Sequence, residues 1–169
     1  MNTRWEAYLD IETTGFHPGL NEITVVGIYI TNNSEERFIQ LVGHKISGDT
    51  ILEALQGVNE LYTYNGHRFD LPFIHARHGV NLESHFYHCD LMHHCWRHNL
   101  YGGLKVVEKR LGIGRQNTEV NGYEAVKLWW RFINDYDKVA LNTLLDYNKE
   151  DVVNLKVLKD MLLNPAKPR

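Results

Sequence analysis

The amino-acid sequence predicts an α/β domain with a mixed β-sheet, and three observations support this. Residues 5–42 contain three runs rich in β-branched and aromatic side chains, joined by short connections. Two further strand-like runs follow, and a helical stretch separates them. From residue 91 onward the apolar residues recur at the spacing of an α-helix. Strands that pair through short turns, followed by alternating helices and strands, are typical of this fold class.

Five strands are expected, at residues 5–11, 23–30, 37–42, 60–64 and 85–90. Turn-forming residues at 17–19 and 32–34 separate the first three, which should therefore pair in antiparallel fashion. Six helices are expected, at residues 49–56, 71–77, 91–98, 104–111, 122–132 and 139–163. Asp49 is expected to cap the first helix, and Gly79 to end the second.

The composition is that of one globular domain. The chain has 169 residues, 43% hydrophobic and 23% charged, which suits a single domain over residues 1–163 followed by a polar tail at 164–169. A formal net charge of −3 gives no overall basic character, although a small catalytic domain can bind phosphates through metal ions and a few local cations. Two cysteines, Cys89 and Cys95, favour a reducing compartment over a disulfide framework. Because there is no signal peptide and no apolar run of membrane length, we predict a cytoplasmic protein without a membrane span.

Two carboxylates lie near the end of the first predicted strand. Residues i and i+2 of a strand point to the same face, so Asp10 and Glu12 should project together. Burying two adjacent negative charges is costly unless a cation compensates them. A hard divalent ion such as Mg²⁺ or Mn²⁺ would do so, whereas the alternative is an exposed strand end with two solvated acids.

Two more acids stand where the fold should bring them near this pair. Asp70 follows a strand and opens a helix, a position that a simple N-cap would also explain. Asp151 lies in the last helix, four residues after Tyr147, so the two share a helix face. The alternatives are a half-buried aromatic and a solvated acid, and Glu150 is the second choice for the functional acid of this helix.

Taken in order, three segments resemble the exonuclease motifs of the DEDD superfamily of RNase H-like 3′–5′ exonucleases, which includes the proofreading domains of DNA polymerases. They are residues 9–15 (LDIETTG), 65–70 (NGHRFD) and 147–151 (YNKED). The tyrosine four residues before the last aspartate resembles the DEDDy branch. Residues 103–112 are similar to a helix that stand-alone exonuclease domains of this kind carry before the last motif. The resemblance implies a five-stranded sheet in the order 3-2-1-4-5 with strand 2 antiparallel to its neighbours.

The resemblance also implies an activity: removal of nucleoside 5′-monophosphates from single-stranded DNA or RNA with a free 3′ end, by a monomer using two Mg²⁺ or Mn²⁺ ions. Asp10 would bridge both ions. Glu12 and Asp151 would complete the site of the ion that activates water, and Asp70 would hold the other. Tyr147 would orient the water, because a phenol with a pKa near 10 is a poor base at neutral pH.

Further residues are candidates for contact with the terminal nucleotide, through backbone N–H groups, hydroxyls, an amide or stacking aromatic rings. They are Thr13, Thr14, Gly15, Phe16, Asn65 and Phe69. Phe69 has an equally good alternative as a core residue. A local basic stretch has two readings, a phosphate-binding track or a solvated helix face. It comprises Lys105, Lys109, Arg110 and Arg115.

Residues 88–98 invite comparison with a zinc site, since His94 and His98 share a helix face and Cys95 is adjacent. The spacing fits no standard zinc finger or ribbon, so surface histidines at a strand–helix junction are the preferred reading. Asp90 is either an outer acid of the proposed metal site or the cap of the helix that follows it, and the cap is the preferred reading.

Two other functions are open. A non-catalytic module that binds nucleic acid or protein on the same fold is the main alternative to an enzyme. A phosphatase of the haloacid dehalogenase type is disfavoured, because its second acid would be an aspartate where Glu12 stands and its sheet would not open with a meander.

Overall fold

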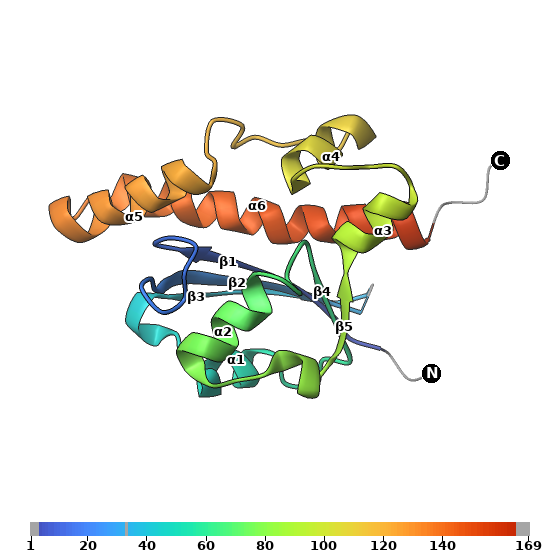
Figure 1. Cartoon of the computed structure of the whole chain (residues 1–169), viewed down its shortest axis with the longest axis horizontal. Helices are drawn as coiled ribbons and strands as arrows, with labels where there is room; N and C mark the ends of the chain where they lie inside the picture. Colours follow the sequence, from blue (N-terminus) through green and yellow to red (C-terminus); the bar gives the residue numbers. More distant parts are fainter. Residues whose placement is uncertain (1–3, 33, 165–169) are drawn as a thin grey trace.

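A computed structural model describes residues 4–32 and 34–164 and places one five-stranded sheet between two layers of helices (Figure 1). The strands are β1 (Glu6–Thr13), β2 (Ile23–Thr31), β3 (Glu36–Val42), β4 (Glu60–Thr63) and β5 (Tyr87–Asp90). Their order in the sheet is β3-β2-β1-β4-β5. β2 runs antiparallel to β1 and β3, whereas β4 is parallel to β1 and β5 is parallel to β4. This confirms the predicted mixed sheet and its strand order.

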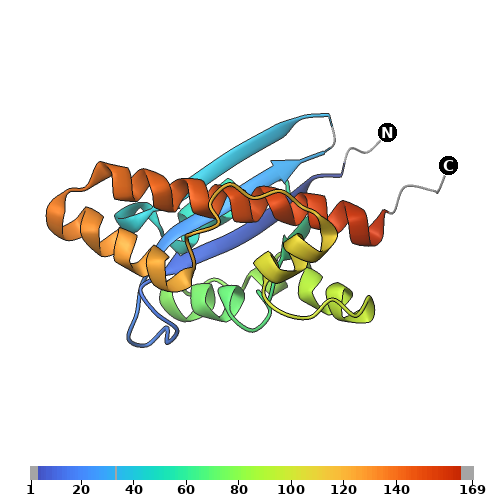
Figure 2. The same ribbon diagram turned by 90° about the horizontal axis from the view of Figure 1, so that it is seen from above.

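The helices form two unequal layers. On one face lie α1 (Gly48–Ala54) and α2 (Asp70–His78), and on the other lie α3 (Leu91–Arg97), α4 (Leu104–Leu111), α5 (Gly122–Asp135) and α6 (Lys138–Leu163). Viewed from above, α6 crosses the sheet along its length and α5 lies beside it (Figure 2). Two short 3₁₀ segments that the sequence did not indicate are η1 (Gly43–Lys45) and η2 (Leu82–Ser84). No helix within the described residues is long and apolar enough to cross a membrane.

Some of the predicted helix caps are confirmed and one is wrong. Ser47, not Asp49, caps α1, because the Ser47 hydroxyl accepts from the Thr50 backbone N–H while the Thr50 hydroxyl accepts from the Ser47 N–H. Gly79 ends α2 in the left-handed conformation, with φ of 73°. Asp90 caps α3 by accepting from the Met92 N–H.

Two predicted segments are only partly covered. The turn at residues 32–34 includes Asn33, which lies outside the described residues, but the Asn32 side chain accepts from the backbone N–H of Ser34 and Glu35, as a turn former does. Of the predicted tail, residues 165–169 also lie outside them.

The pleat of β1 decides which helix layer its side chains meet. Ala7, Leu9 and Ile11 pack into the core shared with α1 and α2. Tyr8 points the other way, into a core that includes Val152 from α6. Because Asp10 and Glu12 are in phase with Tyr8, their side chains lie on the face that α6 covers.

Candidate active site

Three carboxylates from the two ends of the chain meet where β1 passes under α6. One side-chain oxygen each of Asp10, Glu12 and Asp151 lies within 4.8 Å of the others, and these three residues are called the carboxylate trio below. Glu12 and Asp151 are buried. Desolvation, together with the neighbouring Asp151 carboxylate, raises the pKa values of Asp10 and Glu12 well above their usual range. The trio is therefore an electrostatically costly arrangement that a cation would relieve.

Asp70 is held against the same strand but lies outside the trio. It begins α2, where Phe69 is the N-cap residue, so the Asp70 side chain is not needed as a cap. Instead its Oδ1 accepts a hydrogen bond from the backbone N–H of Ile11, at 3.0 Å. Burial raises the pKa of Asp70 to about 7. The carboxyl is thus anchored to the β1 backbone between Asp10 and Glu12.

Tyr147 lies one helical turn before Asp151 on α6 and is buried, with 8% of its surface exposed. Burial, and secondarily the Asp151 charge, raises its pKa above the ordinary value. The phenol is therefore neutral at physiological pH, which suits a group that donates a hydrogen bond and does not abstract a proton.

An open cavity of about 470 Å³ adjoins these groups. Its walls include the trio, Tyr147, five of the six candidate substrate residues and part of α5; the residues from outside the trio are Ile11, Thr13, Thr14, Gly15, Phe16, Phe69, Gly122, Tyr123, Val126 and Tyr147. The Phe16 ring is 82% exposed and meets Phe69 edge-on, with 6.3 Å between centroids. Asn65 does not line this cavity; its backbone N–H donates to Asp90 and its φ is 61°, as in a turn.

The turn after β1 is tightly built, which limits how its side chains can act. The Thr13 hydroxyl donates to the carbonyl of Gly15, at 2.8 Å. The Thr14 hydroxyl accepts from the Glu22 N–H, at 3.0 Å. A Cβ on Gly15 would lie 2.5 Å from the Asn21 amide oxygen, so a larger residue there would require the Asn21 side chain to move. The turn therefore presents a fixed surface to the cavity.

Comparison with protein families decides the relationship. The model of the RNase_H superfamily matches residues 7–163. The chain belongs to the RNase H superfamily. The matched residues include β1, which carries Asp10 and Glu12, and α6, which carries Asp151.

Relatives of this RNase H superfamily member are longer than it is. A protein of Bacillus subtilis strain 168, the uncharacterized protein YprB, is 29% identical over 163 residues, which covers 88% of this chain and 39% of YprB. The chain therefore spans about two fifths of the length of that relative.

Solved structures share the fold at low sequence identity. The family B DNA polymerase of the archaeon Pyrobaculum calidifontis matches 95% of this chain and 24% of its own, at a TM-score of 0.73 and 15% identity. A structure described as the apo form of a nuclease matches 96% of this chain and 72% of its own, at a TM-score of 0.60 and 16% identity. The structure of E. coli exonuclease I with a 5cy-dA13 oligonucleotide matches 96% of this chain and 41% of its own, at a TM-score of 0.52 and 14% identity.

Two cations of this RNase H superfamily domain reach the trio from the α4 side. Arg115 donates through Nη2 to Asp151 Oδ1 and, through Nε and Nη2, to both oxygens of buried Glu108, at 2.7 and 2.8 Å. Burial raises the pKa of Asp151 to about 6, and Arg115 opposes that rise. Lys105 Nζ is buried without a hydrogen-bond partner among the described residues, 4.8 Å from the centre of the Tyr147 ring. Burial lowers the pKa of Lys105.

The predicted basic stretch thus divides into two parts. Lys109 and Arg110 are exposed on α4, whereas Lys105 and Arg115 point toward the trio. Arg115 fits neither of the predicted readings, because its side chain is 6% exposed and paired with two acids. Glu150, the second-choice acid of α6, instead accepts from the backbone N–H of Asn117, at 3.0 Å.

Sequence reasoning missed a pair of amides that hold Asp10. Asn148 is fully buried on α6, and its Nδ2 donates to Oδ2 and to the carbonyl of Asp10, at 3.1 and 3.3 Å. Its Oδ1 accepts from Gln40 Nε2 of β3, at 3.0 Å. A Cβ on Gly27, which pairs with Asp10, would lie 2.1 Å from that Oδ1. The available signal was a polar residue on an apolar stripe, four residues after Leu144.

His94, Cys95 and His98 of the linear histidine–cysteine run belong to no group of metal-ligating side chains found among the described residues. Cys95 is buried in the core between the sheet and α6, while His98 is exposed at the end of α3. Cys89 lies in β5 and Cys95 in α3, as expected, and both are free thiols. The preferred reading of the run as a strand–helix junction agrees with this arrangement.

Proposed function

We propose that this protein is a divalent-metal-dependent 3′–5′ exonuclease acting on single-stranded DNA or RNA with a free 3′ end. It would release nucleoside 5′-monophosphates. The observation that carries the proposal is the carboxylate trio beside Tyr147, on the wall of a cavity that opens to solvent. Four acids from β1, α2 and α6 fit the order and spacing of the DEDDy motifs, and a nuclease and an exonuclease share this fold.

The donor set suits hard divalent ions. All of the acids offer oxygen, which Mg²⁺ and Mn²⁺ prefer, and the raised pKa values of Asp10 and Glu12 mark a site short of positive charge. Asp10, Glu12 and Asp151 would hold one ion, and Asp10 with Asp70 a second. Ions bound there supply activation of a water nucleophile and stabilisation of the leaving oxygen.

The remaining steps fall to the side chains of the protein. Tyr147, as a neutral phenol, donates a hydrogen bond that orients the attacking water. Asn148 keeps the Asp10 carboxylate in one orientation through the hydrogen bond to Oδ2. The rigid turn at residues 13–15 supports the terminal sugar, and the exposed Phe16 ring stacks with the last base, with Phe69 beside it. Contact of Asn65 with the nucleic-acid substrate stays a prediction.

The same proposal places the activity in one domain over residues 1–163, working as a monomer in the cytoplasm. The two free thiols suit a reducing compartment. The phosphatase alternative has no support in this sheet, whose β2 runs antiparallel to both neighbours.

A nuclease gel tests the proposal. Single-stranded DNA and RNA labelled at the 5′ end are incubated with Mg²⁺ or Mn²⁺. We expect a ladder that shortens from the 3′ end and is abolished by EDTA and by Asp10→Ala. Asp49→Ala, an exposed acid in the first turn of α1, is the matched control and should leave the ladder intact. Intact substrate under both metals would reject the exonuclease and favour a non-catalytic binding module.

A further inference from the structure

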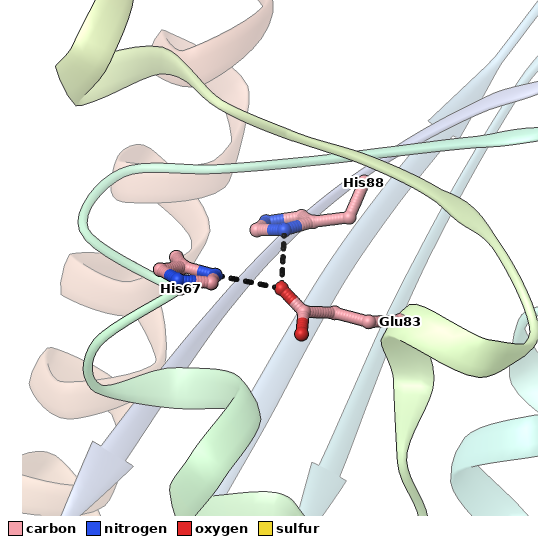
Figure 3. Close-up of side chains that lie close together, drawn as sticks. All are labelled: His67, Glu83 and His88. Carbon is pink, nitrogen blue, oxygen red and sulfur yellow. Dashed lines mark hydrogen bonds and ion pairs between the residues drawn. The ribbon is translucent and has the colours of Figure 1, made fainter.

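A second group of potential metal ligands lies outside the active-site cavity, where the loop between β4 and α2 meets η2 and β5. His67 comes from that loop, Glu83 from η2 and His88 from β5, and Figure 3 shows all three converging. One ligand atom from each lies within 4.8 Å of the others, and they are called the His–Glu–His cluster below. The cluster lines an open cavity of about 420 Å³ that shares no lining residue with the active-site cavity.

The contacts in the His–Glu–His cluster have the dimensions of a coordination sphere. Both imidazoles turn Nδ1 toward the same oxygen, Oε1 of Glu83, at 2.8 Å from His67 and 3.3 Å from His88 (Figure 3). In a tetrahedral zinc site with metal–ligand bonds near 2.0–2.1 Å, adjacent ligand atoms are about 3.3 Å apart. Only small movements would therefore seat an ion between the three atoms.

The environment of the histidines supports ligation. The His88 side chain is 8% exposed, and its Nε2 lies 2.9 Å from the Thr63 hydroxyl. Such a partner on the far ring nitrogen fixes the tautomer and orientation of a metal-ligating histidine. His93 and Asp90 line the same cavity.

We propose that His67, Glu83 and His88 form a binding site for a divalent transition metal, best matched to Zn²⁺. Two imidazoles and one carboxylate are a ligand set of zinc, whereas Mg²⁺ and Ca²⁺ favour all-oxygen sites. The first and last of the three ligands are 21 positions apart in the sequence, and the three come from three different segments, which is why the linear run at 88–98 did not reveal them.

A bound ion would hold the loop that leads into the active site. The backbone N–H groups of Asn65 and His67 already donate to the two oxygens of Asp90, at 2.8 and 3.2 Å. Ligation of the His67 ring would strengthen its existing contact with Glu83 of η2 and would also link the same loop to His88 of β5. Since α2 and Asp70 follow this loop directly, the metal would stabilise the loop conformation that positions Asp70 in the proposed exonuclease site.

Metal content measures the site independently of any nuclease activity. The full chain is equilibrated with Zn²⁺ in millimolar Mg²⁺, so that the carboxylate trio is supplied with its preferred ion, then freed of unbound metal and analysed by mass spectrometry. We expect one equivalent of Zn²⁺, and a rise in Tm on Zn²⁺ addition. Long-range ¹H–¹⁵N NMR of the imidazoles should show Nδ1 of His67 and His88 shifting on titration.

Variants separate this site from the rest of the molecule. His67→Ala and Glu83→Gln should each weaken Zn²⁺ binding by more than the roughly 10- to 100-fold that loss of an outer-shell partner causes. Both side chains are well exposed, at 56% and 41%, so these variants should fold, which circular dichroism checks. His98→Ala, an exposed histidine from the linear run, is the matched control and should bind like the wild type. Absence of Zn²⁺ from the wild type, or full retention by His67→Ala, would overturn the proposal.

Discussion

Replacing Gly27 by alanine should destabilise the protein through a residue on a different element. Gly27 pairs with Asp10 across the sheet, and a Cβ there would meet three atoms of the Asn148 amide at 2.1, 2.8 and 3.1 Å. The amide would have to move, and it would lose its bonds to Gln40 and Asp10. A neutral bond contributes about 1 kcal/mol and one to a charged group about 1.5–3 kcal/mol. Alanine recovers about 0.5–1 kcal/mol relative to glycine in a strand, so we expect a net loss of about 2–3 kcal/mol.

Urea unfolding measures this loss as a lower midpoint at unchanged m-value. Gly19→Ala is the control, since its Cβ would meet nothing within 4 Å and should change the free energy of unfolding little. The decisive comparison is a double-mutant cycle with Asn148→Ala, which removes the group that the new methyl would strike. The cost of Gly27→Ala should then fall by at least about 1 kcal/mol. If the two substitutions are additive, the steric account of Gly27 is wrong.

Three further predictions concern the acids and their partners. Tyr147→Phe should lower the nuclease rate roughly 10- to 100-fold, because it removes one hydrogen bond worth about 1.5–3 kcal/mol. The affinity for Mn²⁺, measured by calorimetry, should stay the same. An unchanged rate would exclude the water-orienting role. Because the pKa of Asp70 is raised to about 7, the metal-free folded state binds more protons than the unfolded state, so its stability should fall as pH rises from about 4 to 7. Asp70→Asn should reduce that slope in urea titrations at each pH and leave the part that Asp10, Glu12 and Asp151 contribute, since their pKa values are raised too. An unchanged slope would show that Asp70 does not contribute to it. Arg115→Met should cost about 3–5 kcal/mol by leaving Glu108 buried without its cation; a cost below about 1 kcal/mol in thermal unfolding would show that Asn154, which also donates to Glu108, suffices.

The parts of the site that depend on short-range geometry were predictable from sequence. The two-residue period of a strand places Asp10 and Glu12 on one face, and the four-residue spacing on a helix places Tyr147 with Asp151. The motif order then gave the strand order of the sheet, through the family resemblance. These inferences need only local periodicity and a known topology.

The contacts that sequence reasoning missed join residues far apart in the chain. Gln40 and Asn148 are 108 residues apart, and Arg115 and Asp151 are 36 apart. No periodicity links such pairs, so their contacts become visible only once the sheet and α6 are packed. The predicted cap of α1 was wrong for a local reason. Ser47 and Asp49 are both good capping residues, and the reciprocal hydrogen bonds with Thr50 select Ser47.

The Asn148–Asp10 contact joins residues 138 positions apart, and this affects when the candidate site can assemble during synthesis. Domains generally begin to fold from the N-terminus as the chain is made. A growing chain that has completed the sheet but not α6 holds Asp10 and Glu12 without Asp151, Tyr147 or the amide that orients Asp10. The carboxylate trio is thus complete only once α6 has left the ribosome and packed on the sheet.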